Sequence, residues 1–111
     1  MSLVHELKVL RGEIKSLTEM IVRLAWRRMS LAVEVGKIKT VLGLPIEERD
    51  VEEDLEREVL RLCSVEGIDR EFALKILRLL IDESKCLQSL VYKNYASFAD
   101  STIKCGWGKE F

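Results

Sequence analysis

Hydrophobic residues recur through the first 42 positions at alternating intervals of four and three. This leucine-rich seam comprises Leu3, Leu7, Leu10, Ile14, Leu17, Ile21, Leu24, Leu31, Val35, Ile38 and Leu42. Arg28 occupies the one position where the alternation is broken, and no proline interrupts residues 3–42. Such a heptad pattern is typical of a long helix that packs against another helix.

The length of this helix predicts a second chain. Forty residues at the α-helical rise span roughly 60 Å, whereas a compact protein of this size has a radius of gyration near ~13 Å. Much of the seam would be bare in such a monomer. We therefore expect an intertwined homodimer in which a partner covers it.

Stop and start signals divide the next part of the chain. Gly43 and Pro45 end the first helix, because glycine suits a C-cap and proline cannot continue a helix. Asp50 and Glu53 have the spacing of a capping box, which predicts a second helix from near residue 50 to Glu66–Gly67. Its apolar stripe comprises Val51, Leu55, Val59 and Leu62, at helical spacing.

Asp69 caps a predicted third helix that runs to about Tyr95. Its apolar face carries Ala73, Ile76, Leu77, Leu80, Leu87 and Val91. Residues 97–111 lose this periodicity and form a tail of unknown role, an extra cap on the bundle, or the start of a linker to a further domain. The expected fold is thus an all-α, three-helix chain, with one helical domain over residues 1–96.

Composition narrows the class of protein. The 111 residues include 18 Lys+Arg and 19 Asp+Glu, so the chain lacks the basic surplus that binds nucleic acid. It has no apolar run long enough to cross a membrane, nor a recognisable secretion signal. Three cysteines without a C-x-x-C pair fit reduced thiols better than disulfides or a zinc site. We expect a cytoplasmic protein without a metal.

Several polar residues stand where the pattern calls for apolar ones. Lys39 lies almost three full turns after Arg28 and shares its face. Ser84 and Gln88 lie one turn apart on the core stripe of the third helix, and Glu52 lies in the first turn of the second. Two cations, a carboxylate, a hydroxyl and an amide in an apolar bundle indicate a site for a small polyanion.

Each of these residues also has a structural explanation. Arg28 is equally well explained as an interhelical ion pair across a dimer seam, and Lys39 as a solvated surface residue. Ser84 can bond its own helix backbone, and Gln88 can fix a coiled-coil register. Glu52 can simply favour the helix start.

The order of several short motifs resembles the all-helical class of chorismate mutase over about residues 3–92. The motifs are Leu10–Ile14 (LRGEI), Arg27-Arg28, Leu31–Lys39 (LAVEVGKIK), Gly43–Ile46 (GLPI), Glu48, Glu52 and Ile81–Gln88 (IDESKCLQ). The resemblance implies rearrangement of chorismate to prephenate by a homodimer with shared active sites, in Phe and Tyr biosynthesis and without a cofactor.

The resemblance also implies a role for individual residues. Arg28 grips a substrate carboxylate, and Arg11 of the partner subunit does the same. Lys39 and Gln88 flank the ether oxygen, while Ser84 bonds a carboxylate. Arg11 and Lys39 are about 42 Å apart on one helix, so they serve one site only if they come from different chains.

The remaining implied contacts concern the substrate ring. Glu48 and Glu52 contact the ring hydroxyl and help to hold Lys39. Val51 departs from the arginine that family members often carry, which puts ring-side contacts in doubt. Two alternatives stay open: an isochorismate-pyruvate lyase on the same scaffold, and a non-catalytic helical dimerisation or regulatory module.

Overall fold

A computed structural model describes residues 2–96 of the chain, and this part contains three α-helices and no strand. The helices are α1 (Leu3–Leu42), α2 (Arg49–Glu66) and α3 (Arg70–Ala96). The predicted all-α, three-helix fold is therefore confirmed. The proposed tail, residues 97–111, lies outside the described residues.

The ends of α1 follow from local capping. The Ser2 hydroxyl accepts a hydrogen bond of 3.1 Å from the His5 backbone N–H at the start. At the other end Gly43 has a φ of 69°, a left-handed conformation that glycine adopts without strain. The predicted stop at Gly43 is confirmed.

The two later helices differ in how they begin. Asp69 caps α3, because its carboxylate accepts a hydrogen bond of 2.9 Å from the Phe72 N–H. The predicted capping box of Asp50 and Glu53 is wrong, since α2 starts at Arg49 behind Glu48, without a side-chain cap. Glu48 is instead ion-paired with Lys39 at 2.9 Å, so a tertiary contact fixes the start of α2.

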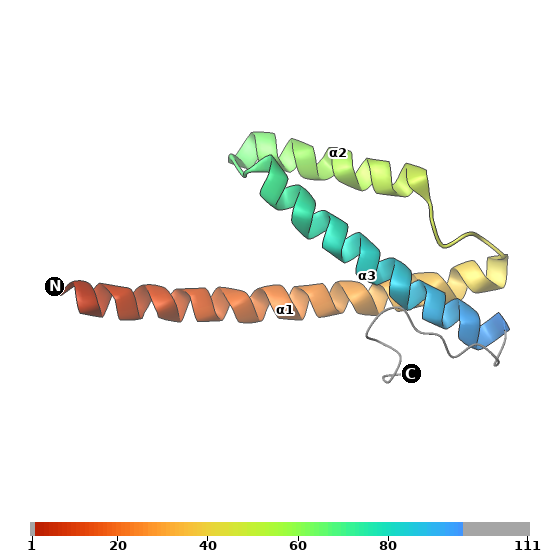
Figure 1. Ribbon diagram of the computed structural model, residues 1–111, viewed down its shortest axis with the longest axis horizontal. Helices are drawn as coiled ribbons and strands as arrows, with labels where there is room; N and C mark the ends of the chain where they lie inside the picture. Colours follow the sequence, from red (N-terminus) through yellow and green to blue (C-terminus); the bar gives the residue numbers. More distant parts are fainter. Residues whose placement is uncertain (1, 97–111) are drawn as a thin grey trace.

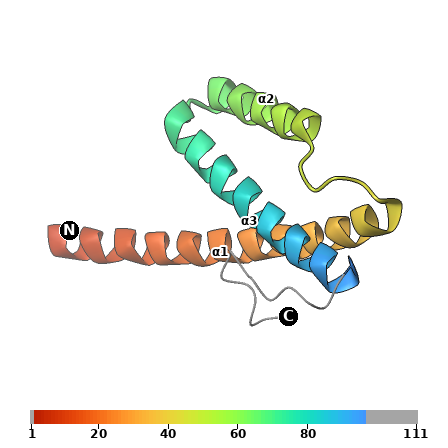
Figure 2. The same cartoon turned by 45° about the vertical axis from the view of Figure 1, so that its right-hand side comes forward.

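The long helix α1 gives the molecule its shape. Its N-terminal half extends beyond both other helices in two views 45° apart (Figures 1 and 2). The chain measures 62 × 33 × 19 Å, with a radius of gyration of 18.2 Å. This exceeds the ~13 Å of a compact domain of similar size and confirms the predicted projecting helix.

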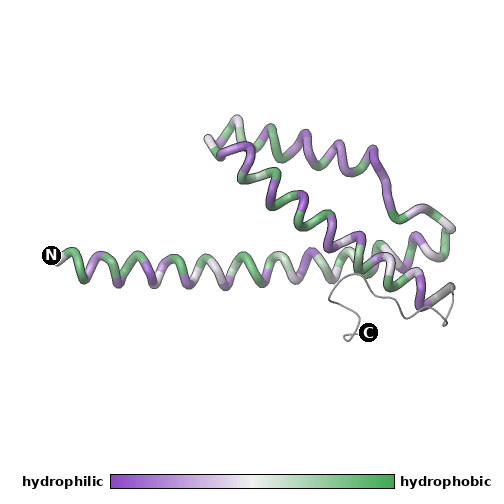
Figure 3. The backbone as a smooth tube through the Cα atoms, in the orientation of Figure 1, coloured by the Kyte–Doolittle hydropathy of each residue, from purple (hydrophilic) through white to green (hydrophobic). Residues whose placement is uncertain are grey.

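Packing of α1 on α3 uses a different face from the leucine-rich seam. The buried residues of α1 are Met29, Ala32, Gly36 and Lys39, in its C-terminal half, where α3 crosses it (Figure 1). Leu87 of α3 is 1% exposed and anchors the core. Every member of the leucine-rich seam is exposed in the single chain, and apolar bands follow the projecting half of α1 (Figure 3).

Two cysteines lie among the described residues. Cys63 is buried, whereas Cys86 is half-buried. None of the helices in residues 2–96 combines the length and apolar character that a membrane span requires.

Candidate active site

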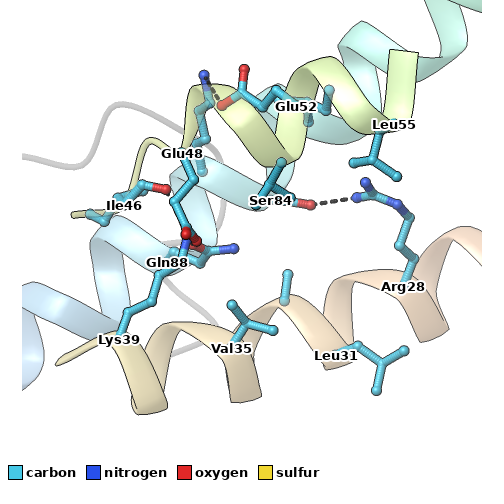
Figure 4. A pocket seen from close by; sticks show the side chains of 14 residues that line it. Arg28, Leu31, Val35, Lys39, Ile46, Glu48, Glu52, Leu55, Ser84 and Gln88 are labelled. Carbon is cyan, nitrogen blue, oxygen red and sulfur yellow. Dashed lines mark hydrogen bonds and ion pairs between the residues drawn. The ribbon is translucent and has the colours of Figure 1, made fainter. Parts of the chain in front are cut away.

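A cavity of about 250 Å³ lies between the C-terminal half of α1, the start of α2 and the C-terminal half of α3. Small-molecule sites begin at roughly 300 Å³, so this volume suits a compact ligand. Its apolar wall includes Leu31, Val35, Val51, Leu55 and Ile81. Charged and polar side chains gather at two ends and along one side of it (Figure 4).

Lys39 forms one end of the cavity and is only 7% exposed. Its ammonium donates to Gln88 Oε1 at 2.9 Å and to the Ile46 carbonyl at 2.8 Å, and it pairs with Glu48 Oε1 at 2.9 Å. A lysine ammonium has three donors, and these three acceptors satisfy them. The alternative that Lys39 is a solvated surface residue is therefore wrong.

Gln88 is 8% exposed and lies directly against Gly36 of α1. A Cβ at position 36 would meet Gln88 Cγ at 3.1 Å and Gln88 Cα at 3.2 Å. The absence of a side chain at Gly36 thus lets α3 approach α1 closely enough for Lys39 to reach Gln88. Because Gln88 Oε1 accepts from Lys39, its amide nitrogen remains oriented toward the cavity as a donor (Figure 4).

Arg28 forms the other end of the cavity. Its guanidinium donates to Ser84 Oγ at 2.6 Å and to the Leu80 carbonyl at 3.2 Å. Burial lowers the pKa of Arg28 from its ordinary value, yet an arginine stays protonated at neutral pH. Both acceptors are neutral, so neither offsets the positive charge that Arg28 presents to a ligand.

The Ser84 hydroxyl contacts both its own helix backbone and Arg28 at the end of the cavity. Its hydroxyl donates to the Leu80 carbonyl one turn earlier, at 2.8 Å, and also accepts from Arg28. The backbone hydrogen bond expected from the structural explanation of Ser84 is thus present. The same bond orients the Ser84 hydroxyl oxygen toward Arg28.

Lys85 lies along the α2 side of the cavity. Its ammonium contacts Glu52 Oε2 at 3.0 Å and Glu47 Oε1 at 2.9 Å. Hydrogen bonds to Glu47 and Glu52 raise the pKa of Lys85, and the bond from Lys85 lowers the pKa of Glu47. Glu52 is therefore paired with Lys85, whereas Glu48 holds Lys39.

Six of the seven candidate site residues line this one cavity. The cavity brings together Arg28, Lys39, Glu48, Glu52, Ser84 and Gln88. Arg11 lies on the exposed, projecting half of α1 and does not line the cavity. Val51 lines the wall without adding a charge, as expected from its side chain.

Sequence reasoning missed Lys85 and the Ile46 carbonyl. Lys85 lies one turn before Gln88 on α3, so its spacing from Ser84 and Gln88 was an available signal. A lysine at an exposed helical position is ordinary, however, and only the fold brings Glu47 and Glu52 to it. The Ile46 carbonyl carries no sequence signal, because every residue has one.

Known proteins resemble this chain over most of its length. The chorismate mutase type II family profile matches residues 10–89. The chorismate mutase of Methanocaldococcus jannaschii is 31% identical over 86 residues, which cover 78% of this chain and 87% of that protein. The bifunctional chorismate mutase/prephenate dehydratase of Escherichia coli K12 is 30% identical over 91 residues, covering 82% of this chain but 24% of the bifunctional protein. The chain therefore belongs to the chorismate mutase type II family.

Proposed function

We propose that the protein is a chorismate mutase that rearranges chorismate to prephenate within aromatic amino acid biosynthesis. The observation that carries this proposal is the pair of donor groups at the two ends of one cavity. Arg28 with Ser84 lies at one end, and Lys39 with Gln88 lies at the other. Membership of the chorismate mutase type II family supports the same substrate.

The reaction breaks one C–O bond and forms one C–C bond within a single molecule, so it calls for restraint and charge stabilisation. We assign Arg28 and Ser84 to a substrate carboxylate, where they hold the flexible molecule with its reacting ends together. We assign Lys39 and Gln88 to the ether oxygen, which gains negative charge as its bond to the ring breaks. Fixed donors stabilise that charge without reorganising during the reaction.

The hydrogen-bond partners of the Lys39 ammonium determine how the substrate can reach it. All three donors of its ammonium have acceptors within the chain. The ether oxygen must therefore replace or share one acceptor. Glu48 is the acceptor best placed to yield, because its side chain is 38% exposed and can rehydrate. In this assignment Glu48 holds Lys39 before binding, and Glu52 accepts from the ring hydroxyl.

A homodimer with shared active sites is the second part of the proposal. The leucine-rich seam is exposed along the whole projecting half of α1, and bare apolar surface of this extent favours association. Arg11 lies on that half, about 42 Å along the helix from Lys39. A second copy that covers the seam can bring its own Arg11 to the cavity, where it would grip the other substrate carboxylate.

Disappearance of chorismate absorbance, measured beside a parallel assay with isochorismate, tests the activity. We expect chorismate to yield prephenate and isochorismate to yield little salicylate. Salicylate and pyruvate as the main products would instead indicate the lyase. Failure to bind either chorismate or a bicyclic transition-state mimic would leave a non-catalytic dimerisation module. We place the protein in the cytoplasm, a reducing compartment that suits cysteines without a C-x-x-C pair.

A further inference from the structure

Lys85 joins the start of α2 to α3 through two carboxylates. Its Nζ lies 2.9 Å from Glu47 Oε1, in the segment before α2, and 3.0 Å from Glu52 Oε2, in the first turn of α2. Both Lys85 and Glu52 line the cavity. Nothing in the activity assigned above uses Lys85.

The two carboxylates stand in different surroundings. The Glu47 side chain is 73% exposed and does not line the cavity, whereas those of Glu52 and Lys85 are each 29% exposed and do. An ion pair with a largely exposed carboxylate contributes little, because water and salt screen it. The contact between Lys85 and Glu52 is therefore the one that can influence a ligand.

Glu52 needs a cation because another carboxylate lies beside it. Glu48 and Glu52 are four residues apart at the start of α2, a spacing at which like charges repel. Lys39 pairs with Glu48 and Lys85 pairs with Glu52, so each carboxylate has its own ammonium. Among the described residues lining the cavity, three cations face two carboxylates. Without Lys85 this positive surplus disappears, and a dianionic substrate would meet an unpaired carboxylate.

We propose that Lys85 is a positioning residue that holds the Glu52 carboxylate toward the cavity and offsets its charge, so that Glu52 accepts a hydrogen bond from the substrate hydroxyl. This inference rests on the proposed chorismate mutase function. The hydroxyl belongs to neither the bond that breaks nor the bond that forms, so its contact persists from bound substrate to transition state. An interaction of this kind acts on KM more than on kcat.

Steady-state kinetics of Lys85→Met, Lys85→Arg and Glu47→Gln test the inference. Lys85→Met keeps the apolar stem but removes the charge, and we expect KM for chorismate to rise about tenfold to hundredfold, as for the loss of a charged hydrogen bond. The kcat should stay within about threefold. Lys85→Arg should restore most of the affinity because it keeps the charge. Glu47→Gln is the matched control and should behave like the wild type.

Kinetics in the Glu52→Gln background show whether Lys85 acts by positioning Glu52 or by a general structural role. If Lys85 acts through Glu52, Lys85→Met should change KM much less when Glu52 is already neutral. Circular dichroism establishes that each variant is folded, and Lys85→Gln replaces Lys85→Met should the latter not fold. An unchanged KM in the charge-removing variant, or an effect of equal size in the Glu52→Gln background, would overturn the inference. Lack of turnover by the wild type would overturn the proposed function as well.

Discussion

Lys39 and Gln88 are 49 residues apart in sequence, and a buried hydrogen bond of 2.9 Å joins their side chains across α1 and α3. Gly36 makes this contact possible, because its missing side chain leaves room for Gln88. The same bond leaves the Gln88 amide nitrogen as a donor toward the cavity. Helix packing and candidate catalysis therefore depend on one close approach.

Replacing Lys39 with alanine should nearly abolish turnover. Loss of one donor at a developing oxyanion costs on the order of 10²–10³ in rate, and Gln88 and Glu48 would also lose a buried partner. Chorismate kinetics under saturating substrate measure the effect on kcat. Lys37→Ala is the control, since Lys37 is exposed and pairs with Glu34 one turn away. Retention of most activity by Lys39→Ala would remove Lys39 from the assigned role.

Alanine at position 36 should weaken both stability and activity. A Cβ there would lie 3.1–3.3 Å from three atoms of Gln88, so α1 and α3 must separate slightly. Overpacking of this kind costs about 1–3 kcal/mol, and the shift moves Gln88 away from Lys39. Urea denaturation and kcat, measured on the same preparation, should both fall.

Gly12→Ala should lose neither stability nor activity, in contrast to alanine at position 36. Position 12 lies inside α1, and a Cβ added there would meet no neighbouring atom within 4 Å. Alanine also favours a helix over glycine by about 1 kcal/mol. This variant should be as stable as the wild type or more stable, with unchanged kcat. Equal behaviour of the two alanine variants would contradict the packing argument for Gly36.

The sequence predicts the helices better than it predicts the site. The boundaries of Leu3–Leu42 follow from a heptad pattern that contains no proline and from Gly43, which are local signals. The start of α2 cannot be read from local signals, because the Glu48 carboxylate pairs with Lys39 and does not cap the helix. Lys85 carries only a weak local signal, its spacing of three residues from Gln88, because its partners Glu47 and Glu52 lie more than 30 residues away.

The leucine-rich seam marks another limit of sequence reasoning. Its period predicts helix packing, but the period alone does not identify the covering element. Within one chain the buried positions of α1 are instead Met29, Ala32, Gly36 and Lys39. They keep helical spacing, but they include a glycine, an alanine and a lysine, so hydrophobicity does not distinguish them. Close helix approach depends on such small residues, whereas a heptad search finds only the large ones.

The link between Lys85 and Glu47 predicts a pH dependence of stability. The hydrogen bond from Lys85 lowers the pKa of Glu47 from its ordinary 4.5. Stability from this group is therefore present above about pH 4.5 and is lost as the pH falls through the lowered pKa. The pKa of Lys85 is raised from 10.5 by Glu47 and Glu52, so its contribution is lost only at strongly alkaline pH.

Urea midpoints of the wild type and Glu47→Gln, measured from pH 7 down to pH 3, test this dependence. The wild type should be slightly more stable at pH 7, and the difference should shrink toward pH 3 as Glu47 takes up a proton. In a Lys85→Met background the same substitution should have a much smaller pH-dependent effect, because only the weaker attraction of Arg49 then lowers the pKa of Glu47. A difference that persists unchanged at pH 3 would contradict the assignment to the ionised carboxylate.

Mixing two inactive variants should restore activity if the proposed dimer shares its sites. Arg28→Ala removes the cation at one end of the cavity, and Arg11→Ala removes the residue assigned to the partner's cavity. In a mixed dimer one site lacks both arginines, while the other combines both wild-type residues. We expect verified heterodimers to recover about half of the wild-type turnover, from one intact site of two. Lack of recovery in heterodimers identified by mass spectrometry would count against the shared site, as would normal turnover by a chain that sediments as a monomer.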